Sequence, residues 1–169
     1  ERESNITAII ENTLESIWSI NTNYEIQYVN AVFTNDFYNY FGVKLFKGVN
    51  LLQALPDFLR PQWKERYDRV FNNEHFVFED KIDLGHNQIY VEVAMSPILV
   101  DGKVIGASFY GKNITERKHA EEELIKLSRA LEQSPVSIII TDLNGVIEYV
   151  NPKVTQITGF EPSELIGQN

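Results

Sequence analysis

The sequence contains an internal repeat, and this feature constrains the fold more than any other. Residues 16–30 (SIWSINTNYEIQYVN) align without gaps on residues 137–151 (SIIITDLNGVIEYVN), and seven of the fifteen pairs are identical. Chance would give roughly one identity, and the offset between the copies is a constant 121 residues. The chain of 169 residues therefore carries two copies of one structural unit.

Each copy predicts a β-hairpin that is followed by a helix. The turn of the first hairpin is Asn21-Thr22-Asn23, and the second contains Asn144-Gly145, a strong signal because both residues tolerate positive φ. Asn30 and Asn151 end the hairpins, and each is expected to cap the next helix with its side chain, so that Asn30→Ala costs about 1 kcal/mol. The predicted helices cover 31–41 and 152–158 and end at Gly42 and Gly159.

The rest of the first copy predicts helices and then three strands. Helical spacing places Trp63, Tyr67 and Val70 on the inner face of a helix over 61–72, after a short helical turn at 51–55. Alternation of apolar residues predicts a strand over 88–99, between strands over 75–83 and 103–114. This order indicates an α+β fold, a five-stranded antiparallel sheet with helices on one face.

A charged segment without Gly or Pro separates the two copies. It predicts a connecting helix over 116–133, with Thr115 as N-cap and Glu116 in the first turn. Apolar residues at coiled-coil spacing form a seam on it, which favours a parallel two-helix contact: Ala120, Leu124, Leu127 and Leu131. An amphipathic stretch near the N-terminus carries Ile6, Ile9, Ile10 and Leu14.

The predicted organisation has four parts. They are an N-terminal helix or linker (1–14), a complete domain (15–115), the connecting helix (116–134) and the truncated start of a second domain (135–169). A lone hairpin with an apolar face is marginal in water and leaves open edges. The second copy is therefore expected to be either disordered or held against another chain, for example by strand exchange.

Composition excludes several classes of function. The formal charge of −9 and the pI of about 4.8 argue against nucleic acid and against an anionic membrane surface, because both need a concentrated positive face. The absence of cysteine removes disulfides and thiolate chemistry. His75, His86 and His119 show no catalytic or ligand spacing, so we predict no catalytic residue and no metal site. Without a signal peptide or a long apolar run, a cytoplasmic location is expected.

Several motifs occur in an order that resembles the PAS family of sensory domains. They are the hairpin ending I-x-Y-V-N in both copies, LFKGVNLL (45–52) echoed by ELIGQN (164–169), Glu92 and Pro97 before DGKVIG (101–106), and NITERK (113–118). The last motif is similar to the ending D-I-T-E-x-K that couples PAS domains to a following helix. Asn113 stands where the family usually has Asp, so the ion pair that the family often makes there is lost.

The resemblance implies a pocket between the inner face of the sheet and the helices. Its expected lining residues are almost all apolar and large: Ile20, Phe37, Phe41, Leu52, Leu55, Trp63, Tyr67, Phe78, Val91, Val93 and Phe109. Polar contributions are expected from Tyr67, Tyr90 and Ser108, since a ligand site needs a few polar groups. A close-packed core without a ligand is the alternative, because small domains are normally filled. Signal coupling is assigned by resemblance to Asn113, Ile114, Thr115 and Glu116.

The cofactors known for the family fit this sequence to different degrees. The photoreactive flavin and coumarate versions need a cysteine, which is absent. The haem version uses a histidine in the helix before the third strand, and residues 61–71 contain none. The sequence is compatible with non-covalent flavin or a small metabolite. Trp63 has the spacing of a core residue and also suits stacking on a flavin ring. No cofactor is predicted.

Function is predicted by this resemblance rather than by a catalytic motif. The leading hypothesis is a sensory and dimerisation module that relays a signal through the connecting helix to an output domain of the same chain. That output is expected to be a sensor histidine kinase in a two-component system; a cyclic-di-GMP enzyme and a chemoreceptor are the other candidates. The rival hypotheses are a receptor for an apolar or aromatic metabolite and a purely structural dimerisation spacer. The expected partner is a second copy of the chain.

Overall fold

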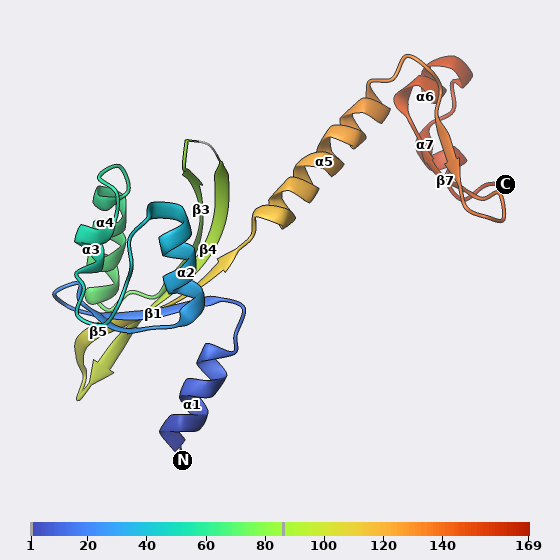
Figure 1. Cartoon of the computed structure of the whole chain (residues 1–169). Coiled ribbons are helices and arrows are strands. Elements are labelled where there is room, and N and C mark those ends of the chain that lie inside the picture. Colours follow the sequence, from blue (N-terminus) through green and yellow to red (C-terminus); the bar gives the residue numbers. More distant parts are fainter. Residues whose placement is uncertain (1, 86) are drawn as a thin grey trace. The chain divides into compact units, whose positions relative to one another are not determined.

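The structure, a computed structural model, describes residues 2–85 and 87–169. The chain divides into two compact units, Glu1–Thr115 and Glu116–Asn169, which we call the first and second unit and describe separately. Figure 1 shows the elements of both units in sequence colours.

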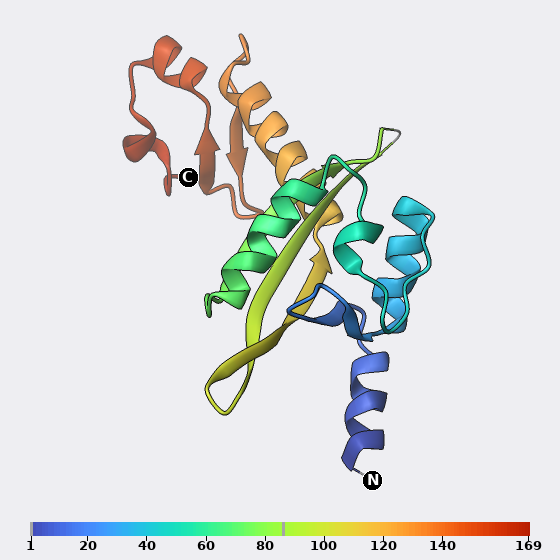
Figure 2. The ribbon, with the colours of Figure 1, turned by 90° about the vertical axis from the view of Figure 1, so that its left-hand side faces the viewer.

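The first unit is an α+β domain built on a five-stranded antiparallel sheet in the order β2-β1-β5-β4-β3. Figures 1 and 2 show α2, α3 and α4 on one face of this sheet, with α4 lying along β4 and β5. The predicted fold class is confirmed. The elements are α1 (Arg2–Glu11), β1 (Ser16–Asn21), β2 (Ile26–Val29), α2 (Ala31–Phe41), α3 (Leu51–Ala54), α4 (Arg60–Phe71), β3 (Phe76–Asp83), β4 (Gln88–Val100) and β5 (Lys103–Asn113).

The core of the first unit lies between the sheet and these helices. The predicted inner face of α4 is correct, since Trp63, Tyr67 and Val70 are all buried. Trp18 on β1 stacks on Phe33 of α2 with ring centroids 4.0 Å apart, and on Phe109 of β5 at 5.1 Å. This aromatic stack joins the N-terminal hairpin to the helical layer and to the central strand of the sheet.

Element boundaries differ from the predictions by one or two residues, as is usual at frayed ends. The helix predicted over 116–133 is α5, Thr115–Glu132. It begins at Thr115, which was predicted as the residue before the helix. The Thr115 hydroxyl accepts a hydrogen bond from the backbone N–H of Tyr90 (2.9 Å), so this side chain ties the helix to β4.

The second unit contains most of α5 and a folded hairpin with two short helices. The elements after α5 are β6 (Ile139–Thr141), β7 (Ile147–Val150), α6 (Pro152–Thr158) and α7 (Pro162–Leu165). The strands of this hairpin are paired, whereas disorder or docking on another chain was predicted, and Ile139, Ile140 and Leu143 are exposed. Across the described ranges of both units, no helix combines the length and the apolar character needed to cross a membrane.

The two hairpins share one register. Trp18 pairs with Val29, Ser19 with Tyr28 and Ile20 with Ile26, and the second hairpin repeats these pairs as Ile139 with Val150, Ile140 with Tyr149 and Thr141 with Ile147. Every partner is displaced by 121 residues, and the irregularity in each ladder falls at the same place. The repeat seen in the sequence is therefore a repeat of backbone geometry.

Candidate functional site

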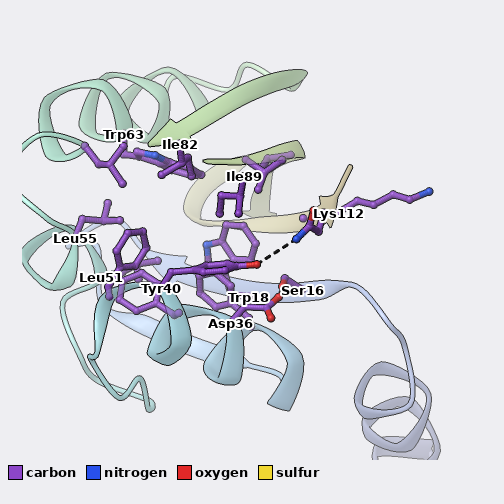
Figure 3. A pocket seen from close by; sticks show the side chains of 18 of the residues that line it. Ser16, Trp18, Asp36, Tyr40, Leu51, Leu55, Trp63, Ile82, Ile89 and Lys112 are labelled. Carbon is purple, nitrogen blue, oxygen red and sulfur yellow. Dashed lines mark hydrogen bonds between the residues drawn. The ribbon is translucent and has the colours of Figure 1, made fainter. Parts of the chain in front are cut away.

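A cavity of about 80 Å³ lies between α2, α3, α4 and the sheet of the first unit. One water molecule needs about 10–15 Å³ of such space, so the cavity has room for a small ligand. Trp63 and Ile82 line one side, and Trp18 and Tyr40 line the opposite side (Figure 3). The lining residues are Ser16, Trp18, Phe33, Asp36, Phe37, Tyr40, Phe41, Leu51, Leu55, Leu59, Trp63, Tyr67, Ile82, Ile89, Val91, Val93, Gly111, Lys112 and Asn113.

The predicted lining and the observed lining overlap in part. The structure brings seven of the predicted residues together around the cavity: Phe37, Phe41, Leu55, Trp63, Tyr67, Val91 and Val93. The other four pack beside it without lining it: Ile20, Leu52, Phe78 and Phe109. Phe78, for example, makes an edge contact with Trp63, with ring centroids 5.8 Å apart, and packs behind this lining residue.

Of the three predicted polar contributors, only Tyr67 lines the cavity. Burial raises the pKa of its hydroxyl. Ser108, in contrast, is exposed and donates a hydrogen bond to the carbonyl of Ser96 (3.4 Å). Tyr90 does not line the cavity, and its backbone is bonded to the start of α5.

Asp36 and Tyr40 on α2 supply polar groups that the sequence reasoning missed. The Ser16 hydroxyl donates to the Asp36 carboxylate (3.2 Å); burial raises the pKa of Asp36, and this bond partly offsets the rise. Burial and the charge of Asp36 raise the pKa of Tyr40, while Asn113 lowers it. Both residues follow Phe33 at helical spacing, three and seven positions further along α2, so helical periodicity could have found them. Lys112 points its ammonium group away from the cavity (Figure 3).

Two indole nitrogens close to the cavity lack hydrogen-bond partners among the described residues. They belong to Trp18 and Trp63, which are 2% and 6% exposed. A buried donor without an acceptor costs about 1–3 kcal/mol. The walls of this cavity are therefore less completely satisfied than those of an ordinary core.

The predicted coupling residues lie where β5 passes into α5. The Asn113 amide donates to the Tyr40 hydroxyl (3.1 Å, dashed in Figure 3), and its oxygen accepts from the backbone N–H of Thr115 (3.0 Å). Ile114 is buried and its backbone N–H donates to the carbonyl of Tyr90 (2.8 Å). Glu116 is exposed in the first turn of the helix. Tyr40 on the cavity wall is thus bonded to Asn113, the last residue of β5, which in turn accepts from the first residue of the outgoing helix.

The predicted seam on α5 is largely exposed. Ala120, Leu124 and Leu127 are exposed and Leu131 is half-buried, and α5 has no buried residue within the part of the chain that the structure describes. Apolar residues at this spacing on a solvated helix suit a second helix as partner. The dimer itself stays a prediction.

The two predicted caps behave differently. The Asn30 side chain accepts from the backbone N–H of Phe33 (3.1 Å), which confirms that it caps α2. Asn151 occupies the N-cap position of α6, but its side chain makes no cap hydrogen bond. The prediction that the Asn151 side chain caps α6 was therefore wrong. Among the described residues, its oxygen accepts only the bond from the backbone N–H of Ile138 (2.9 Å), which Asn30 also makes with Ile17 in addition to its cap.

Metal and haem ligands are not gathered at this site. No group of three or more histidine or acidic side chains is placed to hold a metal ion in residues 2–85 and 87–169. Helix α4 contains no histidine, and His86 lies outside the described residues. The cavity as observed suits a small and mostly apolar molecule, with polar groups at Asp36, Tyr40 and Asn113.

The fold and the cavity together define a small α+β domain with a helix that leaves its last strand. Comparison with protein families matches the PAS fold at residues 11–119 and again at residues 125–169. The chain belongs to the PAS family, and the second match lies within the second unit. PAS domains are typically non-catalytic sensory modules. No curated protein matches the chain.

Solved structures support the fold. The PAS domain of Bordetella pertussis BvgS is 19% identical with a TM-score of 0.57, and the match covers 77% of this chain and 98% of that one. A PAS domain from Colwellia psychrerythraea is 12% identical with a TM-score of 0.54, covering 69% and 100%. The phage VqmA–DPO complex is 15% identical with a TM-score of 0.54, covering 79% and 63%. At these identities the likeness concerns the fold alone.

Proposed function

We propose that the first unit is a receptor for a small, mostly apolar molecule and that it relays binding into α5. The carrying observation is the pair of hydrogen bonds from Tyr40 through Asn113 to Thr115. Tyr40 lines the cavity, and Thr115 is the first residue of α5. A ligand that engages the Tyr40 hydroxyl competes with Asn113 for it and changes the contact that holds the start of the helix.

The residue type at position 113 matters for this relay. An asparagine side chain donates and accepts at the same time, whereas a carboxylate only accepts. Asn113 uses both capacities, as donor to Tyr40 and as acceptor from Thr115. A hydrogen bond of this kind contributes about 1 kcal/mol, which is small enough for the differential affinity of a ligand to shift.

The relay is proposed to act on a pair of helices. The exposed seam of α5, represented by Leu124 and Leu127, suits a parallel contact with a second copy of the chain. A change of register or rotation in paired helices passes along the chain without a diffusing messenger. The output domain is proposed to be a sensor histidine kinase, on family analogy alone.

The receptor proposal is tested by NMR on the ¹⁵N-labelled chain with indole as an aromatic probe. Indole is expected to shift the resonances of cavity residues and also the amide of Thr115. In Tyr40→Phe the cavity residues still respond but Thr115 does not, because the hydroxyl that accepts from Asn113 is gone. Tyr38→Phe is the matched control, since Tyr38 lies on the same helix and is 48% exposed.

Two results would overturn the receptor proposal. In the first, indole perturbs only surface residues. In the second, Thr115 responds equally in Tyr40→Phe and in the native chain. A purely structural spacer is then the better description of the first unit. A flavin band in the absorbance spectrum of the purified protein would instead identify a bound cofactor.

The dimer proposal is tested by sedimentation. Leu124→Asp combined with Leu127→Asp places two charges on the seam and is expected to convert a dimer to a monomer. Ile125→Asp is the control, because Ile125 is 51% exposed on the same helix but lies off the seam. If the double variant sediments like the native chain, the seam is not the dimer contact.

A further inference from the structure

Asn30 and Asn151 are the buried polar residues of the described chain, and both have no exposed surface. Asn30 sits where three segments meet. Its side-chain amide donates to the carbonyls of Ile10 (3.3 Å) and Glu15 (2.9 Å), and its oxygen accepts from the backbone N–H of Ile17 (3.0 Å). We call these four residues the first joint. It connects the last turn of α1, the linker and the start of β1.

The same arrangement recurs in the second unit. The Asn151 amide donates to the carbonyls of Leu131 (3.1 Å) and Val136 (2.9 Å), and its oxygen accepts from the N–H of Ile138. We call these four residues the second joint. Each partner is displaced by 121 residues from its counterpart in the first joint. All six partner atoms are backbone atoms, so the joint forms even though Glu15 is replaced by Val136.

The joint is not explained by helix capping. Asn30 caps α2, whereas Asn151 makes no cap bond to α6, so capping is not what the two copies share. They share the bonds to the preceding helix and to the backbone N–H of Ile17 or Ile138, at the start of the hairpin. The carbonyls of a last helical turn lack partners within the helix, and the asparagine amide supplies one. The end of the helix is thereby fixed to the hairpin.

We propose that Asn151 is a positioning residue that receives the displacement of α5 and passes it to the second PAS unit. In the same way, Asn30 receives the displacement of α1 for the first unit. The two units then act in series, each coupled to the helix that precedes it. This goes beyond the proposed receptor function, which ends at the start of α5.

The path beyond each joint supports this role. In the first unit the asparagine leads directly into α2, whose Asp36 and Tyr40 line the cavity. Glu11, the last residue of α1, reinforces this joint by accepting from the Tyr28 hydroxyl (2.7 Å) and from the N–H of Ala31 (3.0 Å). Burial and the Glu11 bond raise the pKa of Tyr28 to about 12, so the hydroxyl remains a donor. An incoming helix therefore acts on the wall of the cavity.

Hydrogen exchange on the full chain tests the second joint without any ligand. Ala130→Gly loosens the last turns of α5, because glycine is the poorer helix former. In the native background this change is expected to speed exchange of the Ile140 and Tyr149 amides roughly two- to tenfold. This fold-change corresponds to the coupling free energy that is usual between residues in contact. In Asn151→Ala the same change has no further effect, because the helix is no longer bonded to the hairpin.

Matched variants separate positioning from mere stability. Asn151→Asp keeps an acceptor for the Ile138 N–H but offers no donor to Leu131, so it is expected to lose the coupling as well. Gln156→Ala on α6 is the control and preserves it. If Asn151→Ala prevents folding of the hairpin, Asn151 is kept and exchange of its side-chain amide protons is measured instead. The proposal requires this exchange to be faster in Ala130→Gly than in the native chain.

Two outcomes overturn the proposal. Exchange at Ile140 and Tyr149 is unchanged by Ala130→Gly in the native background, or it rises equally with and without Asn151. Either result would mean that Asn151 stabilises only its own surroundings and does not transmit a displacement of α5. Because no probe molecule is added, a failure of indole to bind the first unit leaves this experiment unaffected.

Discussion

The two hairpins of the chain have the same backbone and very different surroundings. Trp18 and Ile20 on β1 are 2% and 0% exposed, whereas Ile139 on β6 is 51% exposed. Register, ladder irregularity and the asparagine joint are nevertheless the same in both. The geometry of each hairpin is therefore encoded in its own sequence. Strands β3 to β5 bury the first hairpin but do not determine its shape.

The comparison also separates local from tertiary stability. A hairpin that is held only by its own ladder and one asparagine has little apolar area removed from water. The first hairpin gains the aromatic stack of Trp18 on Phe33 and Phe109. We therefore expect equivalent substitutions in the two copies to differ in cost according to what the rest of the sheet provides.

The largest expected difference is between Trp18→Ala and Ile139→Ala. Removing the Trp18 side chain from the core is expected to destabilise the first unit by about 4 kcal/mol. Ile139→Ala is expected to cost less than about 1 kcal/mol, because this side chain is half in solvent. Urea titrations followed by residue-resolved NMR give both values in one chain. Equal costs would show that the second hairpin is buried against another surface in solution.

The second largest effect concerns Asn30. Removing its side chain leaves several buried backbone groups without partners, among them the N–H groups of Ile17 and Phe33. Because each such group costs about 1–3 kcal/mol, Asn30→Ala is expected to destabilise the first unit by about 3 kcal/mol. The same urea titration measures it. A loss of only about 1 kcal/mol, the value for a simple cap, would mean that the joint contributes nothing.

Sequence reasoning anticipated what is local or periodic and missed what depends on tertiary contacts. The hairpins and α2 follow from their turn and capping residues, and the inner face of α4 and the alternation of β4 follow from spacing. The joints were missed because their partners are backbone atoms, which leave no residue pattern. The cavity lining was only partly found, since Ile82 and Ile89 reach it through the pairing of β3 with β4.

A smaller effect comes from the turn residues Tyr24 and Gly145, which both have positive φ (63° and 86°). The strain at Tyr24 is offset by ring contacts to Phe71 (5.6 Å) and by a hydrogen bond of its hydroxyl to Asp68. Tyr24→Gly is expected to destabilise the first unit by about 1 kcal/mol, because the lost contacts outweigh the relieved strain. If the variant is more stable than the native chain in the urea titration, strain dominates at this turn.

The smallest expected effect is a pH dependence of the second turn, which has a carboxylate where the first turn has a neutral amide. Asn21 in the first turn accepts from the N–H groups of Asn23 (2.9 Å) and Glu25 (3.0 Å). Asp142 makes the same pair of bonds in the second turn, to Asn144 (2.8 Å) and Val146 (2.9 Å). The N–H of Val146, followed by that of Asn144, lowers the pKa of Asp142 against a raising effect of burial.

The sign of the pH dependence follows from this lowered pKa. The folded turn binds its proton less readily than the unfolded chain, so the stabilisation is complete above the ordinary value of 3.8 and is lost as the pH falls through the lowered pKa. After division by the intrinsic exchange rate at each pH, NMR between pH 5 and 2 is therefore expected to show a smaller protection factor of the Val146 amide at the acid end. Asp142→Asn should remove this dependence and make the second turn behave like the first. A dependence that persists in Asp142→Asn would assign the acid sensitivity to another carboxylate and leave the two turns equivalent.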